Sequence, residues 1–102
     1  DLKIGVAGPH ASGEAADPAV EVRAFCPQYG VPEDPVTGSL NAGIGQWLTV
    51  TGDLPASYVA AQGTVLGRTG RVHVAREGDT LWVGGRTTTT VAGEVHLGPH
   101  PA

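Results

Sequence analysis

The stretch that decides the fold reads PEDPVTGSLNAGIGQWL and spans residues 32–48. Its first part is acidic and rich in proline, which favours a stiff turn. Its second part places Leu40, Ile44, Trp47 and Leu48 at positions i, i+4, i+7 and i+8, which form one face of a helix. The pattern predicts a largely buried helix over about residues 39–50, with Trp47 in the core and strands around it.

The ends of this helix are also marked in the sequence. Thr37 or Ser39 can cap the start, because a side-chain hydroxyl can accept a backbone N–H of the first turn. Gly52, followed by Pro55, is typical of a helix end. An acidic loop therefore leads directly into a helix N-terminus, where free backbone N–H groups and the positive end of the helix dipole attract anions.

The rest of the chain predicts short strands and turns. Alternating apolar residues indicate strands at 2–6 and 20–26, and a third strand is expected at 57–63. The turn Glu77-Gly78-Asp79 indicates a hairpin of 71–76 with 80–83, and β-branched residues indicate one or two last strands within 87–97. Gly78 lies where the hairpin turn favours a positive φ. The sequence thus predicts an α+β domain of about six strands, with one central helix inside a curved sheet.

Composition excludes several classes of partner. The chain has 102 residues, enough for one domain, and a net charge of −4. Without a basic run, a nucleic acid is not an expected partner. The apolar runs are too short to span a membrane, and no signal peptide is visible. Cys26 is the single cysteine, which excludes an internal disulfide and is consistent with a reducing cytoplasm.

Two residues of the second strand have alternative interpretations. Cys26 is either a nucleophile or a small buried apolar residue, and the second is favoured because no base accompanies it in the sequence. Arg23 either binds a substrate carboxylate or lies on the polar face of the strand, and the strand face is favoured.

Two further segments give no site. Residues 8–18 read as a solvated connector that lacks the Lys-Ser/Thr pair of a phosphate-binding loop. His96 and His100 are four residues apart, but Pro99 prevents them from sharing a helical face. No metal site is predicted.

Several motifs together carry a resemblance to a known family. The segments RAFCP (23–27) and GVPEDPVTGS (30–39) resemble the signature of the phenazine-biosynthesis isomerase-like family. The segments QG (62–63), GRTG (67–70), VGG (83–85) and VAG (91–93) are similar to its later motifs. The resemblance covers residues 22–93.

The resemblance also implies a more detailed fold. It is that of diaminopimelate epimerase, with two similar halves, each a strongly bent, mostly antiparallel sheet wrapped around one central helix, and an active site between them. This chain is similar to the second half without its opening segment. Residues 1–102 are therefore expected to form a single, incomplete C-terminal half-domain.

The resemblance implies roles for three residues. Asp34 matches the aspartate that orients the substrate, Ser39 matches a serine that assists proton transfer or contacts substrate, and Gly38 with Ser39 matches the backbone anchor of the substrate carboxylate. Related racemases carry a cysteine where Ser39 stands, so two-thiol racemisation is not expected. The family's main acid/base glutamate and a histidine belong to the first half; Glu33 is not that glutamate. From spacing alone, the favoured interpretation is that Asp34 is a turn residue bonding its own backbone and that Ser39 is only a cap, and it is the resemblance that favours the site roles.

The expected function is part of a cofactor-independent isomerase or epimerase-like enzyme that moves a proton on a small carboxylate-bearing metabolite. The alternative is a non-catalytic module for small-anion binding or oligomerisation. The expected partners are the substrate and either a second copy, in a homodimer, or a missing N-terminal half. Neither a cofactor nor a membrane or nucleic-acid partner is expected, and the expected location is the cytoplasm.

Overall fold

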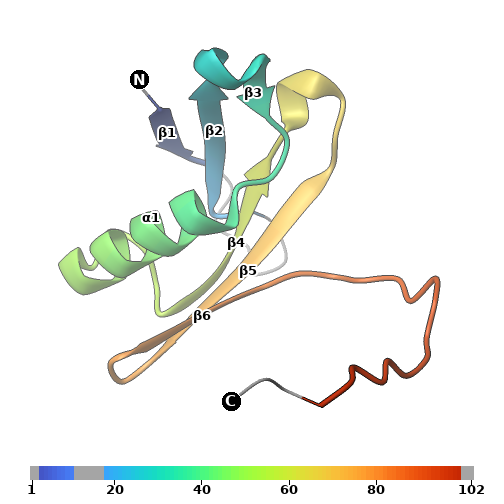
Figure 1. The fold of residues 1–102 in the computed structure, drawn as a ribbon. Coiled ribbons are helices and arrows are strands. Elements are labelled where there is room, and N and C mark those ends of the chain that lie inside the picture. Colours follow the sequence, from blue (N-terminus) through green and yellow to red (C-terminus); the bar gives the residue numbers. More distant parts are fainter. Residues whose placement is uncertain (1–2, 11–17, 100–102) are drawn as a thin grey trace.

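The computed structural model describes residues 3–10 and 18–99, in which one helix lies against an open mixed sheet (Figure 1). The strands are β1 (Ile4–Pro9), β2 (Val20–Cys26), β3 (Val31–Asp34), β4 (Ser57–Gln62), β5 (Gly70–Glu77) and β6 (Thr80–Gly84). The helix is α1 (Gly38–Thr51), and short 3₁₀ turns, η1 (Pro27–Tyr29) and η2 (Thr64–Leu66), follow β2 and β4.

The sheet has the order β1-β2-β4-β5-β6, and β3 pairs with β2 beside this path. The β2–β4 pair is parallel, and the other pairs are antiparallel. A parallel pair needs a crossover connection. Here the crossover contains β3 and α1, and it therefore carries the whole acidic loop and the helix start across one face of the sheet.

These observations confirm the α+β class and the mostly antiparallel sheet with one helix. The strands expected at 2–6, 20–26 and 57–63 correspond to β1, β2 and β4, and the predicted hairpin is β5–β6, with Gly78 at φ 59°. One strand was missed, because β3 lies in the proline-rich stretch that was interpreted as a turn. It pairs with β2 only at Ala24–Asp34 and Cys26–Val31, with a register shift between them.

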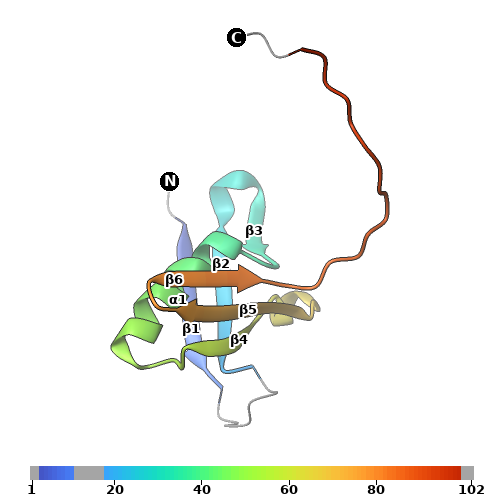
Figure 2. The same cartoon turned by 90° about the horizontal axis from the view of Figure 1, so that it is seen from below.

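The predicted strands within residues 87–97 are wrong. This segment is not a strand, and both views show it leaving the body of the domain as an extended tail (Figure 2). Val91 is 89% exposed and Leu97 is 80% exposed. Residues with strand propensity need a neighbouring strand for their backbone N–H and C=O groups, and the described residues supply none here.

The core lies between α1 and the sheet. It consists of Val20, Val22, Ile44, Leu54, Tyr58, Ala60, Val72 and Val74, with Leu40, Leu48 and Leu81 packed at its margin. The helix bounds agree with the prediction, and Gly52 ends the helix with φ 85°.

Burial of the helix is smaller than predicted. Only Asn41, Ile44 and Gly45 of α1 are buried, and Trp47 is 65% exposed rather than a core residue. One layer of strands covers a single side of a helix. Trp47 lies on the side that the described strands leave open, so helical spacing alone placed it wrongly.

This difference predicts a clear contrast between two neighbouring substitutions. Ile44→Ala removes a side chain packed in the core and should lower the free energy of unfolding by about 2–3 kcal/mol. Trp47→Ala removes the larger side chain but should lower it by less than about 1 kcal/mol. Urea denaturation of both variants checks this, and a larger loss for Trp47→Ala would contradict the position of the helix.

Candidate functional site

The two carboxylates of the acidic loop lie on opposite faces of the sheet. Glu33 and Asp34 are consecutive residues of β3, and consecutive side chains of a strand point to opposite faces. Asp34 pairs in register with Ala24, whose side chain is buried, whereas Glu33 contacts Arg23 on the other face. The backbone therefore separates a structural carboxylate from a candidate site carboxylate.

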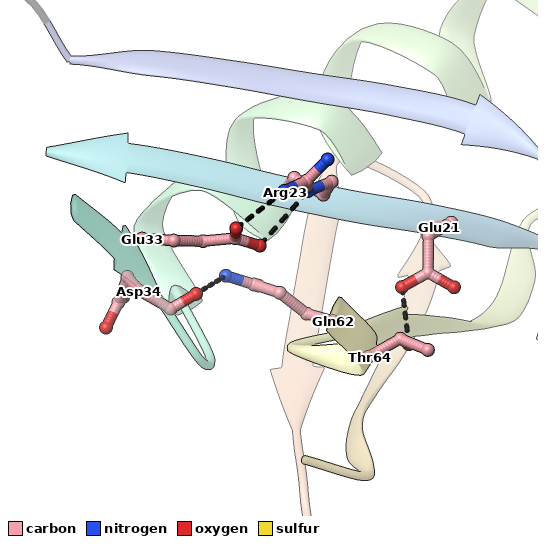
Figure 3. Close-up of polar contacts among 6 residues, drawn as sticks. All are labelled: Glu21, Arg23, Glu33, Asp34, Gln62 and Thr64. Atoms are coloured by element: carbon pink, nitrogen blue, oxygen red, sulfur yellow. Dashed lines mark hydrogen bonds and ion pairs between the residues drawn. The ribbon is translucent and has the colours of Figure 1, made fainter. Parts of the chain in front are cut away.

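Glu33 forms a bidentate ion pair with Arg23 (Figure 3). Arg23 donates from Nη2 to Oε1 at 2.8 Å and from Nε to Oε2 at 3.1 Å, and its guanidinium lies over the Phe25 ring at 4.9 Å. The hydrogen bonds from Arg23 lower the pKa of Glu33, and the same bonds raise the pKa of Arg23. Arg23 thus lies on the polar strand face, as favoured, and joins β2 to β3.

This ion pair predicts an acid-dependent contribution to stability. Because folding lowers the pKa of Glu33 below its ordinary value of 4.5, the contribution is complete above that pH. It decreases as the pH falls from 4.5 through the lower folded-state pKa. Urea denaturation from neutral pH to well below 4.5 should show the advantage of the wild type over Glu33→Gln shrinking with acid. Glu77→Gln, at an exposed strand end, controls for loss of one charge; an advantage that grew with acid would contradict the role of the pair.

Asp34 is half-buried and accepts hydrogen bonds from Thr37 and Gln62. Thr37 Oγ1 donates to its Oδ2, and Gln62 Nε2 donates to its backbone carbonyl at 3.0 Å, the contact drawn in Figure 3. Thr37 is the N-cap residue of α1, but its hydroxyl makes no capping bond. The predicted cap is therefore wrong in its contact, because that hydroxyl contacts Asp34 instead. Ser39 lies inside the first helical turn, not at the cap.

A buried pair of amides lies beneath this loop. Gln62 and Asn41 are both 0% exposed. Gln62 Oε1 accepts from Thr37 N and from Asn41 Nδ2, each at 2.9 Å, and Gln62 Nε2 donates to Thr37 Oγ1 at 2.9 Å. Asn41 Nδ2 also donates to the Thr37 carbonyl at 2.8 Å. Gln62, the last residue of β4, is thereby hydrogen-bonded to the N-cap residue Thr37 and to Asn41 in the first turn of α1.

Gly38 and Ser39 open the helix, and both are exposed. Helix geometry leaves the first N–H groups of α1 without intrahelical acceptors, so these amides are available to an anion. An open groove of about 740 Å³ borders Gly38 and Val36, and its other lining residues include Arg71, His73 and Arg86. Exposed N–H groups and two guanidinium groups favour a negatively charged ligand.

The loop also contacts the backbone after β4. Gly63 has φ 82°, and a Cβ atom built there would lie 2.7 Å from the Pro35 carbonyl oxygen. A Cβ at Gly70 would lie 3.1 Å from the same oxygen and 2.5 Å from the Gln62 carbonyl oxygen. Only residues without a side chain allow this approach. The glycines at positions 63 and 70 therefore allow the acidic loop to pack directly against the backbone after β4.

The other polar groups of interest, including Cys26 and His96, are not part of the hydrogen-bond network of Asp34, Thr37 and Gln62. Cys26 is a free, half-buried cysteine at the end of β2. His96 pairs with Glu94 at 3.3 Å on the exposed tail, and His100 lies outside the described residues. Glu21 accepts from Thr64 and contacts His10 at 3.1 Å on the face that carries Arg23.

The described part of the chain lacks two features that would point to other kinds of function. Residues 3–10 and 18–99 hold no group of three or more His, Cys, Asp or Glu side chains arranged for a metal ion. Over the same residues, no helix combines the length and apolar character needed to cross a membrane.

Sequence reasoning missed Gln62 as a site residue. It was noted only as part of a glycine-containing motif. A signal was present, since Gln62 stands at an inward-facing position of β4 two residues after the buried Ala60. A polar side chain at such a position needs hydrogen-bond partners. Those partners come from the loop between β3 and α1 and from the first turn of α1, and only the folded structure shows that these segments pack over Gln62.

Comparison with known proteins agrees with the motifs. No curated protein matches the chain. A family profile described as phenazine biosynthesis-like protein matches residues 3–94, which include β1 to β6, the acidic loop and α1. The chain therefore belongs to the phenazine biosynthesis-like protein family and is related to isomerase-like enzymes.

Proposed function

We propose that the chain is part of a cofactor-independent isomerase or epimerase-like enzyme that shifts a proton on a small carboxylate-bearing metabolite. One observation carries this proposal. Thr37 and Gln62 hold Asp34, at the end of β3, close in the chain to the first turn of α1, which begins with the exposed residues Gly38 and Ser39. Gly38 also borders a groove whose lining includes two arginines. Such a site can hold a carboxylate and orient the carbon next to it.

Each residue has a distinct proposed task. The amides of Gly38 and Ser39 bind the substrate carboxylate, and Arg71 and Arg86 attract it into the groove. Asp34 orients a polar group of the substrate, and the Ser39 hydroxyl assists the proton. In the reaction one C–H bond breaks, a proton returns either to another carbon or to the opposite face of the same carbon, and the number of electrons is unchanged. No redox group is needed.

The second acid/base is proposed to come from a facing half of the enzyme. Proton transfer needs a group within about 2.6–3.2 Å of the reacting atom, or one water away. Gly38 and Ser39 are open to solvent, so a facing half would also exclude water and strengthen the electrostatic contacts. This half is proposed to be an upstream N-terminal half of the enzyme. The free thiol of Cys26 favours a reducing compartment, and we propose the cytoplasm.

The exposed apolar residues favour a second candidate, a module for association. Trp47 and Val50 are 65% and 69% exposed on α1, and Val91 and Leu97 extend from the tail. Apolar surface of this kind marks sites of protein contact. A homodimer through exposed apolar residues of this kind, without catalysis, is the alternative proposal, and light scattering distinguishes a dimer from a monomer.

A titration tests the carboxylate anchor. Adding acetate or malonate to the ¹⁵N-labelled chain should shift the amide resonances of Gly38 and Ser39 in a saturable way. Sodium chloride at the same ionic strength controls for screening. The Gly52 amide, at the opposite end of α1, should not respond. Shifts confined to other residues would exclude the anchor.

A further inference from the structure

We propose that Gln62 is the positioning residue of this site, with Thr37 as the group through which it acts on Asp34. The inference rests on the proposed function, because it assigns a task within the same site. Gln62 is fully buried and reaches neither the groove lining nor solvent. Its task is therefore to hold other groups in place rather than to contact substrate.

The backbone fixes which way the Gln62 amide points. The Thr37 N–H is a donor, so the atom 2.9 Å from it must be the amide oxygen. The Asp34 carbonyl is an acceptor, so the atom 3.0 Å from it must be the amide nitrogen. The two backbone contacts give the same orientation, and a flipped amide would lose both.

This orientation determines the direction of the next hydrogen bond. Gln62 Nε2 has only hydrogens to offer, so the Thr37 hydroxyl must accept from it. A hydroxyl has one hydrogen, and that hydrogen then points to Asp34 Oδ2. Gln62 thereby directs the Thr37 hydroxyl onto Oδ2 of Asp34, and Oδ1 is the oxygen proposed to face the substrate.

The same side chain holds both ends of the loop. It binds the carbonyl of Asp34 before Pro35 and the N–H of Thr37 after it, so it closes the turn from its inner side. Asn41 binds the Gln62 oxygen and the Thr37 carbonyl, which fixes this turn to the first turn of α1. The distance between the carboxylate and the helix N-terminus therefore depends on one buried amide.

Gln62→Met tests this task, since methionine has a similar length and makes none of the four hydrogen bonds. We expect the Thr37 amide to exchange with solvent at least about tenfold faster, relative to the amides of β5. We also expect acetate to bind at Gly38 and Ser39 at least about tenfold more weakly. Val22→Ala, beside Gln62 in the register of β2 and β4, is the matched core control. It should lower stability while leaving both readouts close to the wild type.

Two milder variants keep the proposal testable if Gln62→Met does not fold. Thr37→Val removes the hydroxyl at constant shape and should weaken acetate binding, whereas Thr37→Ser keeps the hydroxyl and should bind as the wild type does. Unchanged Thr37 protection in Gln62→Met, or equal weakening in Thr37→Val and Thr37→Ser, would overturn the inference. If the wild type binds no acetate, the carboxylate anchor fails, and the exchange rate of the Thr37 amide still decides the task of Gln62.

Discussion

Asp34→Asn in the proposed complete enzyme, with this chain joined to its proposed facing half, is expected to lower the rate of proton transfer by about 100-fold or more. The amide side chain keeps the shape but loses the charge that is proposed to orient the substrate. The new amide N–H would face the Thr37 hydroxyl, which now donates to Asp34 Oδ2, so one of these donors would lose its acceptor. Misplacement of a substrate by about 1 Å already costs a factor of this size.

The measurement does not require the substrate to be identified in advance. A panel of small carboxylates is incubated in D₂O, and exchange of carbon-bound hydrogen for deuterium is followed by NMR. The complete enzyme should exchange one class of compound, and the 102-residue chain alone should exchange none. Exchange by the isolated chain would refute the requirement for a facing half.

Asp53→Asn is the matched control. Its carboxylate also accepts a threonine hydroxyl, from Thr51, but lies after the opposite end of α1. The two substitutions remove the same charge and disturb the same kind of hydrogen bond. Only Asp34→Asn should slow exchange by about 100-fold or more; equal rates in both variants would make Asp34 a turn residue.

Gly63→Ala is expected to lower the free energy of unfolding by roughly 2–5 kcal/mol. An L-residue at φ 82° costs about 1–2 kcal/mol. The added methyl group would also lie 2.7 Å from the Pro35 carbonyl oxygen, and forcing such a contact costs about 1–3 kcal/mol more. Because the contact is with backbone, relief requires movement of the acidic loop.

Gly67→Ala separates these two costs. Gly67 ends the same 3₁₀ turn with φ 73°, and a methyl group there meets no atom within 4 Å. It should lose only the conformational part, about 1–2 kcal/mol. Urea denaturation gives both losses, and the Thr37 and Gly38 amide shifts should move in Gly63→Ala alone. Equal losses in the two variants would show that the loop does not rest on Gly63.

Much of the fold is local and was therefore predictable. The alternation of Val20, Val22 and Ala24, the turn at Gly78 and the stop at Gly52 each depend on neighbouring residues along the chain. The α+β class followed from these elements. Asp34 stands only four residues before Gly38, so the sequence already placed it near the start of the helix. In the structure, Asp34 ends β3 and α1 begins at Gly38.

The rest depended on which elements meet in space. Helical spacing gave Trp47 and Ile44 the same apolar face, but a single sheet layer covers Ile44 and leaves Trp47 exposed. The strand β3 forms only because β2 passes beside it, and residues 87–97 remain extended because no described strand does the same for them. Sequence analysis could not identify Gln62 as a site residue, because its hydrogen-bond partners lie 21 to 28 residues earlier in the chain. A buried amide acquires its function from the backbone folded over it, and only the tertiary structure supplies that backbone.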